Sequence, residues 1–297
     1  MKLVQSIMTR SWVAGLKAVT CGNDGCSQWL STRQLASRRV GVSMGECWYC
    51  SYRCFALAAE ERFAQLLTQG FSPSNHVPRM PFGLLMLRRG WLSDEQLRIA
   101  TEEQRQTGDE MGELLVRFGF VSEEQVTTAR AIQWGCPVFS VSSPKLPAAS
   151  CLPLTLMDCY LMTPVHYVAA TRQLLVGFVQ AIEYGALYGL EQVTACKAQP
   201  CFITANDFRV QQQLQLKQAI PEELKFDDVQ SSGEMARILC SYGVLVSADR
   251  VAVARCKEYL WARLTSASKA VDLLFETKKT FRPAPSSLIG EKGGIQG

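Results

Sequence analysis

The stretch that decides the fold reads PFGLLMLRRGWLSDEQLRIATEEQ at residues 81–104 and returns as EMGELLVRFGFVSEEQVTTARAIQ at residues 110–133. At an offset of 29 residues, nine of the 23 positions from 82 to 104 are identical. So many matches at one offset indicate an internal duplication. The sequence therefore predicts two copies of one structural unit over residues 82–133.

The residue pattern of each copy predicts a pair of antiparallel helices. A short first helix, over 82–89 or 111–118, ends at a glycine that can adopt the left-handed conformation typical of helix C-termini. The second helix begins after Ser93 or Ser122, and the glutamine three residues later completes a capping box. Acidic residues follow each serine, where the positive end of the helix dipole favours them. The repeat is thus expected to be a pair of αα-hairpins.

The motif of each copy is x-aliphatic-Gly-x2-Leu-Leu-x2-Gly-x6-Leu-x3-Leu-x2-Gln, and a five-residue spacer separates the copies. It resembles the duplicated motif in the N-terminal domain of the ATPases of type II secretion and type IV pilus assembly, the GspE/PilB/MshE family. The resemblance covers residues 79–217 and implies a helical part at 79–133 followed by a small α/β part at 134–217. The ATPase domain that follows in that family has no counterpart in this sequence.

Within the α/β part we expect a strand pair, a helix, two further strands and a polar helix, in that order. The expected ranges are 167–170 and 174–178 for the strand pair, about 180–190 for the helix, about 192–197 and 201–204 for the two strands, and 206–217 for the polar helix.

In that family this domain, named MshEN, can bind cyclic di-GMP, so the resemblance implies a dinucleotide site in the repeat. It would consist of apolar walls for the purines, glycines that allow close approach to phosphate, and a polar glutamine at the end of each motif. The implied residues are Phe82, Gly83, Met86, Leu87, Gly90, Leu97, Gln104, Met111, Gly112, Leu115, Gly119, Val126 and Gln133.

Three positions depart from the family's motif. Pro81 stands where the first motif has an arginine, and a proline can neither neutralise phosphate nor pair with guanine. A charge-assisted contact contributes about 1.5–3 kcal/mol, so its loss would weaken binding by about one or two orders of magnitude. Arg79 is an alternative donor two residues earlier. Thr101 and Arg130 replace aliphatic residues in the second helices.

Cysteines near the N-terminus predict a metal site. The pairs Cys21-x4-Cys26 and Cys50-x3-Cys54 supply four thiolates, a ligand set that zinc favours. The N-terminal segment that contains these cysteines, which we call the head, has few large apolar side chains and would gain stability from a bound metal ion. The string from Trp48 to Phe55 resembles the second half of treble-clef zinc fingers, whose helix begins at the last cysteine pair, and this leaves Cys47 as the spare thiol. The alternative is a set of buried or redox-labile thiols.

Composition limits the remaining function classes. With 297 residues, 47% hydrophobic and 20% charged, the chain suffices for two or three domains. It contains no apolar run of membrane-spanning length and no secretion signal, so we expect a cytoplasmic protein with no membrane span and reduced thiols. It has no P-loop and two histidines, His76 and His166, without evident catalytic partners, so we expect no enzyme.

The first 54 residues carry seven basic and two acidic residues, a local charge of +5 within a net charge of +4. We interpret this as a solvated surface, with nucleic acid, anionic lipid or an acidic partner as alternatives. Near the other end we expect a linker at 218–230, a helical region at 231–277 and a flexible tail at 278–297. The helices of this region would run from Ser232 to Tyr242 and from Ser247 to Leu264 and form a further αα-hairpin, an arrangement that a DNA-reading helix-turn-helix could share.

The sequence therefore predicts an α+β multidomain protein, with a zinc-stapled module and helix at 1–70, the MshEN-like domain, and a helical C-terminal region. Its expected function is that of a non-enzymatic bacterial adaptor or regulatory protein. Such an adaptor would bind a component of a secretion, pilus or motility system, with cyclic di-GMP as a further ligand. The alternative function is a zinc-dependent, DNA-binding transcriptional regulator, although nucleic acid is the less favoured partner.

Overall fold

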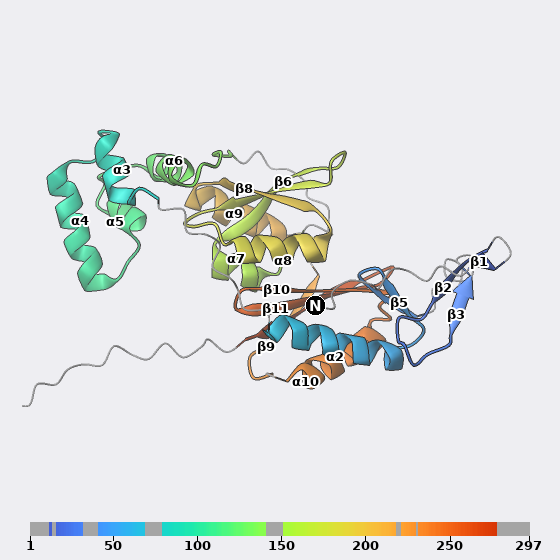
Figure 1. Ribbon diagram of the computed structural model, residues 1–297. Coiled ribbons are helices and arrows are strands. Elements are labelled where there is room, and N and C mark those ends of the chain that lie inside the picture. Colours follow the sequence, from blue (N-terminus) through green and yellow to red (C-terminus); the bar gives the residue numbers. More distant parts are fainter. Residues whose placement is uncertain are drawn as a thin grey trace, which may run out of the picture.

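The computed structural model describes residues 12–13, 16–31, 41–68, 79–140, 151–217, 221–229 and 231–277. Figure 1 shows a helical repeat, a small α/β subdomain beside it, and a larger sheet built from both ends of the described chain. The predicted α+β multidomain fold is confirmed. The expected tail at 278–297 lies outside the described residues.

The repeat consists of α3 (Phe82–Arg88), α4 (Asp94–Thr107), α5 (Met111–Arg117) and α6 (Glu123–Trp134). Both capping boxes are formed, from Ser93 with Gln96 and from Ser122 with Gln125. Gly90 and Gly119 end the first helices at φ values of 68° and 70°. Helix α3 packs on α6 and α4 packs on α5, so the two copies bury one another's apolar faces.

The α/β subdomain follows. Its elements are α7 (Leu154–Tyr160), β6 (Met162–Val168), β7 (Gln173–Phe178), α8 (Tyr184–Thr194), β8 (Lys197–Phe202) and α9 (Ala205–Leu216). Strand β7 lies between β6, which is antiparallel to it, and β8, which is parallel.

Two details of the sequence prediction for this subdomain are wrong. The strands expected near 192–197 and 201–204 are one strand, β8, because α8 extends to Thr194 with Leu190 and Val193 in the core. The first strand of the pair begins at Met162, five residues earlier than expected, since Met162 and Val165 are buried on it.

A six-stranded sheet in the order β5-β4-β10-β11-β12-β9 joins the two ends of the described chain. Strand β4 pairs in parallel with β10, and β9 pairs in parallel with β12. A separate three-stranded sheet lies at the N-terminal end of the described chain. The elements are β1 (Trp12–Val13), β2 (Leu16–Thr20), β3 (Trp29–Ser31), β4 (Val42–Met44), β5 (Cys47–Tyr49), β9 (Glu222–Phe226), β10 (Arg250–Cys256), β11 (Tyr259–Thr265) and β12 (Ala270–Glu276).

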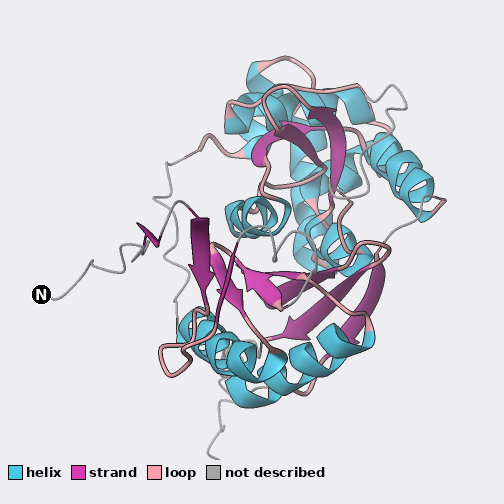
Figure 2. Cartoon of the chain, turned by 90° about the vertical axis from the view of Figure 1, so that its right-hand side faces the viewer, coloured by secondary structure: helices cyan, strands magenta, loops and turns pink. Residues whose placement is uncertain are grey.

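Helices cover both faces of the six-stranded sheet (Figure 2). Helices α2 (Tyr52–Thr68) and α10 (Ser232–Leu245) pack against each other and against one face. Helices α7 and α8 of the α/β subdomain pack on the other face. The sheet therefore has no solvated face over its central strands.

This double burial explains why the predicted helix from Ser247 to Leu264 is wrong. On β11, Leu260 and Ala262 face α2 and α10, whereas Tyr259 and Trp261 face α7 and α8. A strand buried on both faces shows no alternation of apolar and polar residues, so its sequence cannot be told from a buried helix by periodicity. The expected linker at 218–230 contains β9. Of the predicted helical region only α10 is helical, so no helix-turn-helix is formed there.

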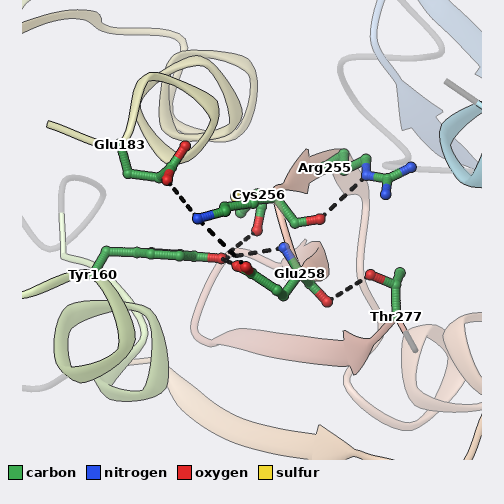
Figure 3. A network of polar contacts seen from close by, with 7 residues as sticks. Tyr160, Glu183, Arg255, Cys256, Glu258 and Thr277 are labelled. Carbon is green, nitrogen blue, oxygen red and sulfur yellow. Dashed lines mark hydrogen bonds and ion pairs between the residues drawn. The ribbon is translucent and has the colours of Figure 1, made fainter. Parts of the chain in front are cut away.

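The turn between β10 and β11 fastens the α/β subdomain to the sheet (Figure 3). The Tyr160 hydroxyl hydrogen-bonds the Cys256 carbonyl at 2.5 Å and the Glu258 carboxylate at 2.9 Å, and Lys257 Nζ lies 2.8 Å from a Glu183 carboxylate oxygen. Burial raises the pKa of Tyr160, and the nearby Glu258 carboxylate adds to this, so the hydroxyl stays protonated. The contacts hold the subdomain at a fixed position on the sheet.

Close packing of α8 on β10 gives a first prediction. A Cβ on Gly189 would lie 2.3 Å from Cys256 Sγ and 2.8 Å from the Arg255 carbonyl oxygen. Gly189→Ala is therefore expected to push the helix off the strand and to lower the free energy of unfolding by about 1–3 kcal/mol in a denaturant titration. Gly25→Ala is the control, because its Cβ meets nothing closer than 3.5 Å. Equal midpoints for both variants would contradict the prediction.

Candidate functional site

Four cysteines from three places in the N-terminal part meet at one point. Cys21 and Cys26 lie on the turn after β2, Cys50 directly follows β5, and Cys54 lies in the first turn of α2. Their sulfur atoms all lie within 4.8 Å of one another. The turn is closed by the Cys26 amide, which donates to the Asn23 carbonyl at 2.8 Å, and the Gly22 amide fastens it to β5 by donating to the Trp48 carbonyl at 2.8 Å.

The geometry of this cluster fits a tetrahedral metal ion. The sulfur of Cys50 lies 3.7 Å from that of Cys26 and 3.7 Å from that of Cys54. In a tetrahedral site with zinc–sulfur bonds of about 2.3 Å, the sulfurs are about 3.8 Å apart. Cys21 is buried and the other three are half-buried, as for a closed structural site. The four cysteines could therefore hold one zinc ion.

The pKa values of Cys50 and Cys54 depend strongly on the neighbouring thiols. Desolvation raises the pKa of Cys50 to about 12, and hydrogen bonds with Cys26 and Cys54 add to the rise. Desolvation also acts on Cys54, but hydrogen bonds from Cys50 and Ser51 outweigh it and lower the pKa to about 7. Four thiolates at this separation repel one another, and a bound cation is what allows all of them to ionise. Cys47 lies outside the cluster and is exposed.

The apolar residues of the implied dinucleotide site lie mostly within the repeat's own core. Met86 and Leu115 are fully buried, and Val126 is 5% exposed. The half-buried members, Phe82, Leu87, Leu97 and Met111, pack against the same core. Purine walls need an open face, and these side chains already contact one another.

The four glycines have structural reasons of their own. A Cβ on Gly83 would lie 2.6 Å from Leu97 Cδ1, and one on Gly112 would lie 2.9 Å from Val126 Cγ1, so both allow close contact between the helices of a copy. Gly90 and Gly119 supply the left-handed residues after α3 and α5, with open space around them.

The two glutamines at the motif ends bind backbone. Gln104 Nε2 donates to the Asp109 carbonyl at 3.0 Å, and Gln133 Nε2 donates to the Met80 carbonyl at 2.7 Å. Each amide therefore holds the chain just ahead of a first helix. Both contacts serve the fold of the repeat without any ligand.

Arg130, which occupies an aliphatic position of the motif, is buried and contacts both its own copy and the α/β subdomain. It is 5% exposed, its Nη2 lies 2.5 Å from a Glu110 carboxylate oxygen, and its Nη1 donates to the Val179 carbonyl. The guanidinium lies 5.7 Å from the Phe82 ring centre, and a Cβ on Gly112 would be 2.7 Å from Nη2. Sequence reasoning missed this pair, although Glu110 opposite Pro81 in the repeat alignment was the available signal.

A cavity of about 390 Å³ lies beside this ion pair. It lies between the second copy and α9, and its lining includes Gly112, Val126, Arg117 and Arg209. Two carboxylates, of Glu113 and Glu123, line it as well. Arg130 lines this cavity too. The residues present therefore fit a cyclic dinucleotide poorly in the closed core of the repeat and better at this cavity of the second copy.

These features define a class of protein: a duplicated αα-hairpin domain with an α/β subdomain, docked on a sheet that has a cluster of four cysteines at its N-terminal strands. Among the described residues, no helix combines the length and the apolar character needed to cross a membrane.

No family model and no curated protein matches the sequence, but several solved structures are similar. The structure of MshE with cdg matches with a TM-score of 0.39 and 21% identity, over 46% of this chain and 99% of that chain. The N-terminal domain of XpsE matches in two crystal forms, with TM-scores of 0.35 and 0.28 and identities of 17% and 20%. These matches cover 44% and 43% of this chain and 91% and 89% of the other. The similarity is one of fold, and it is of the kind that the repeat motif predicts.

Proposed function

We propose that this protein is a non-enzymatic bacterial adaptor in the cytoplasm, which binds a protein component of a secretion, pilus or motility system. The observation that carries the proposal is the closed core of the repeat, in which the apolar residues of the implied dinucleotide site pack against one another. Side chains that are packed in a core support the structure, so the repeat acts as a rigid scaffold. The non-enzymatic part rests on the sequence, which lacks a P-loop and has two histidines.

In this proposal zinc is structural. Bound by Cys21, Cys26, Cys50 and Cys54, it would fix the N-terminal strands and α2 on the sheet. The head then presents a fixed surface to a partner, as treble-clef fingers do.

A second candidate function is that of a cyclic di-GMP receptor. Its support is the motif resemblance, the cavity of about 390 Å³ at Gly112, and MshE, whose structure contains cdg. Arg209 lines this cavity and forms no ion pair with any other described residue. It would supply the positive charge that Pro81 removes from the first motif.

Calorimetric titration of cyclic di-GMP into the full chain decides between the two. If the repeat is a scaffold, any heat observed is the same for the wild type, Gln104→Ala and Arg209→Ala. Low-micromolar binding that either variant weakens by about tenfold or more, the size of one lost charge-assisted contact, would overturn the scaffold proposal and establish the receptor.

A further inference from the structure

A hollow of about 900 Å³ lies between α3, the end of α6 and the start of α8. It combines arginines with apolar and aromatic side chains, and no aspartate, glutamate or lysine is among the described residues that line it. Its lining includes Arg79, Met80, Arg88, Ile132, Trp134 and Tyr184. We call it the arginine hollow.

The two copies of the repeat can be compared position by position at this hollow, because the same contact orders both. Gln104 Nε2 donates to the Asp109 carbonyl, and Gln133 Nε2 donates to the carbonyl of Met80, the equivalent of Asp109 at the offset of 29 residues. Helix α5 packs on α4 as α3 packs on α6. The surroundings of α5 in the second copy therefore have structural equivalents around α3 in the first.

The second copy neutralises an arginine that the first copy leaves charged. Arg117 Nη1 lies 2.9 Å from Asp109 Oδ2, and Arg117 Nη2 lies 3.7 Å from Glu103 Oε1. The equivalent of Arg117 in the first copy is Arg88, which is exposed. Within the part of the chain that the structure describes, Arg88 forms no ion pair.

Exposed apolar side chains occupy the positions of both missing acids. Met80 stands at the position of Asp109, and Ile132 stands at the position of Glu103. Each is 40% exposed and lines the hollow. The second copy shows that the fold accepts acids at these two positions, so packing within the repeat does not require apolar residues there. The first copy thus combines an unpaired charge with exposed apolar surface at one place.

Aromatic side chains extend this surface onto α8. Arg79 Cζ lies 3.5 Å from the centre of a Trp134 ring, so the guanidinium is stacked on the indole, and the Trp134 ring lies 6.3 Å from that of Tyr184. Tyr184 is 43% exposed, and Tyr188, one turn later, is 61% exposed. Arginine, tryptophan and tyrosine contribute most of the binding energy in many protein interfaces, whereas lysine and acids are depleted in the centre of such interfaces. The hollow has this composition.

We propose that the arginine hollow is a docking surface for an acidic peptide segment of a partner protein. Carboxylates of the segment would pair with Arg88 and Arg89, since guanidinium and carboxylate form charge-assisted, bidentate hydrogen bonds. Apolar side chains of the segment would cover Met80 and Ile132, which a partner that offered charge alone would leave exposed. This inference rests on the adaptor function and adds to it the surface and the chemistry of the partner.

Charge also indicates that the occupant comes from another protein. The segments of this chain that lie outside the described residues contain a single acidic residue, Glu291, and carry more basic residues than acidic ones. On charge they do not complement a hollow lined by three arginines.

The test is a selection from a display library of short random peptides on the full chain. The enriched peptides are expected to combine several acidic residues with large apolar or aromatic ones. An enriched peptide is then synthesised and titrated into the full chain by calorimetry. Its affinity is expected to fall as the salt concentration rises, because the arginines that it contacts are exposed.

Ile132→Glu is the decisive variant, because it gives Arg88 the acid that Arg117 has in Glu103. It is expected to weaken binding of the selected peptide by about tenfold or more, the size of one lost charge-assisted contact, and Arg88→Ala is expected to weaken it to a similar extent. Ile99→Glu is the matched control. It is the same substitution on α4, at a residue that is also 40% exposed and does not line the hollow, and it should leave binding unchanged.

Three outcomes would overturn the proposal. The first is a selection that enriches no acidic peptides. The second is a selected peptide that binds Arg88→Ala and Ile132→Glu as tightly as the wild type; if Cys50→Ser abolishes its binding instead, the head is the docking surface and the adaptor function stands without the hollow. The third is a wild-type chain that is a dimer by light scattering and that Ile132→Glu converts to a monomer, which would assign the hollow to a second copy of this chain.

Discussion

Cys50→Ser is expected to release the metal and to unfold the N-terminal strands together with α2. The Cys50 sulfur lies 3.7 Å from two of the other three sulfurs, so its loss breaks the centre of the cluster. Structural zinc contributes an apparent ~10–16 kcal/mol in small zinc domains, which exceeds the total stability of many domains. Metal analysis is expected to find about one zinc per wild-type chain and none in the variant.

The loss of structure in Cys50→Ser is expected to extend to β10 and α10, which are distant in the sequence. Strand β4 pairs with β10, and α2 packs on α10. Hydrogen exchange should therefore show lost protection in β10 and α10 as well as in the head. The repeat has a separate core and should keep its protection.

Cys47→Ser is the matched control for this experiment. Cys47 is an exposed thiol on β5, three residues before Cys50 and outside the cluster. Its replacement should leave metal content and melting temperature unchanged. A wild-type protein that is folded without metal, and that melts at the same temperature as Cys50→Ser, would refute the zinc site.

Local signals account for what the sequence predicts correctly. A capping box needs a serine and a glutamine three residues apart, and the αL glycine follows its helix directly, so α3 to α6 can be found from short strings. The four cysteines are similar, because each pair is short-spaced and a single turn or helix start positions it. Within each helix terminus and each cysteine pair the residues are close in the chain, whereas the contact between the two pairs joins Cys26 to Cys50 over 24 positions.

Long-range pairing accounts for what the sequence does not predict. The parallel pairing of β4 with β10 joins residues about 200 positions apart, and no local sequence pattern near Val42 or Arg250 predicts it. The strands β10 and β11 are apolar on both faces because helices from different parts of the chain cover them. Glu110 and Arg130 are likewise ordinary polar residues until the helices bring them together.

The largest effect expected outside the metal site comes from Asp272→Ala. Asp272 is fully buried on β12, and its carboxylate accepts hydrogen bonds from Trp261 Nε1 at 2.8 Å and from Arg263 Nε and Nη2 at 2.7 Å. Arg263 is 5% exposed, so removal of the carboxylate leaves a buried positive charge without its counterion. Breaking such a pair from one side costs about 3–5 kcal/mol.

This pair also carries a contact between parts of the fold. Arg263 Nη2 donates to the Cys151 carbonyl at 2.7 Å, just ahead of α7. Asp272→Ala should therefore lower the free energy of unfolding in urea and, in hydrogen exchange, reduce the protection of α7. Glu222→Ala removes a nearby but exposed ion pair, with Lys269 at 2.6 Å, and should change stability by less than about 1 kcal/mol.

A double variant separates the charge from the packing. Asp272→Leu combined with Arg263→Met removes both charges and keeps apolar volume, and replacing a buried pair in this way is often neutral or stabilising. The double variant should therefore be more stable than Asp272→Ala, although Trp261 Nε1 loses its acceptor. If the double variant is as unstable as Asp272→Ala, then the pair stabilises the sheet by its hydrogen bonds to Trp261 and Cys151, and the unpaired charge is not the cause.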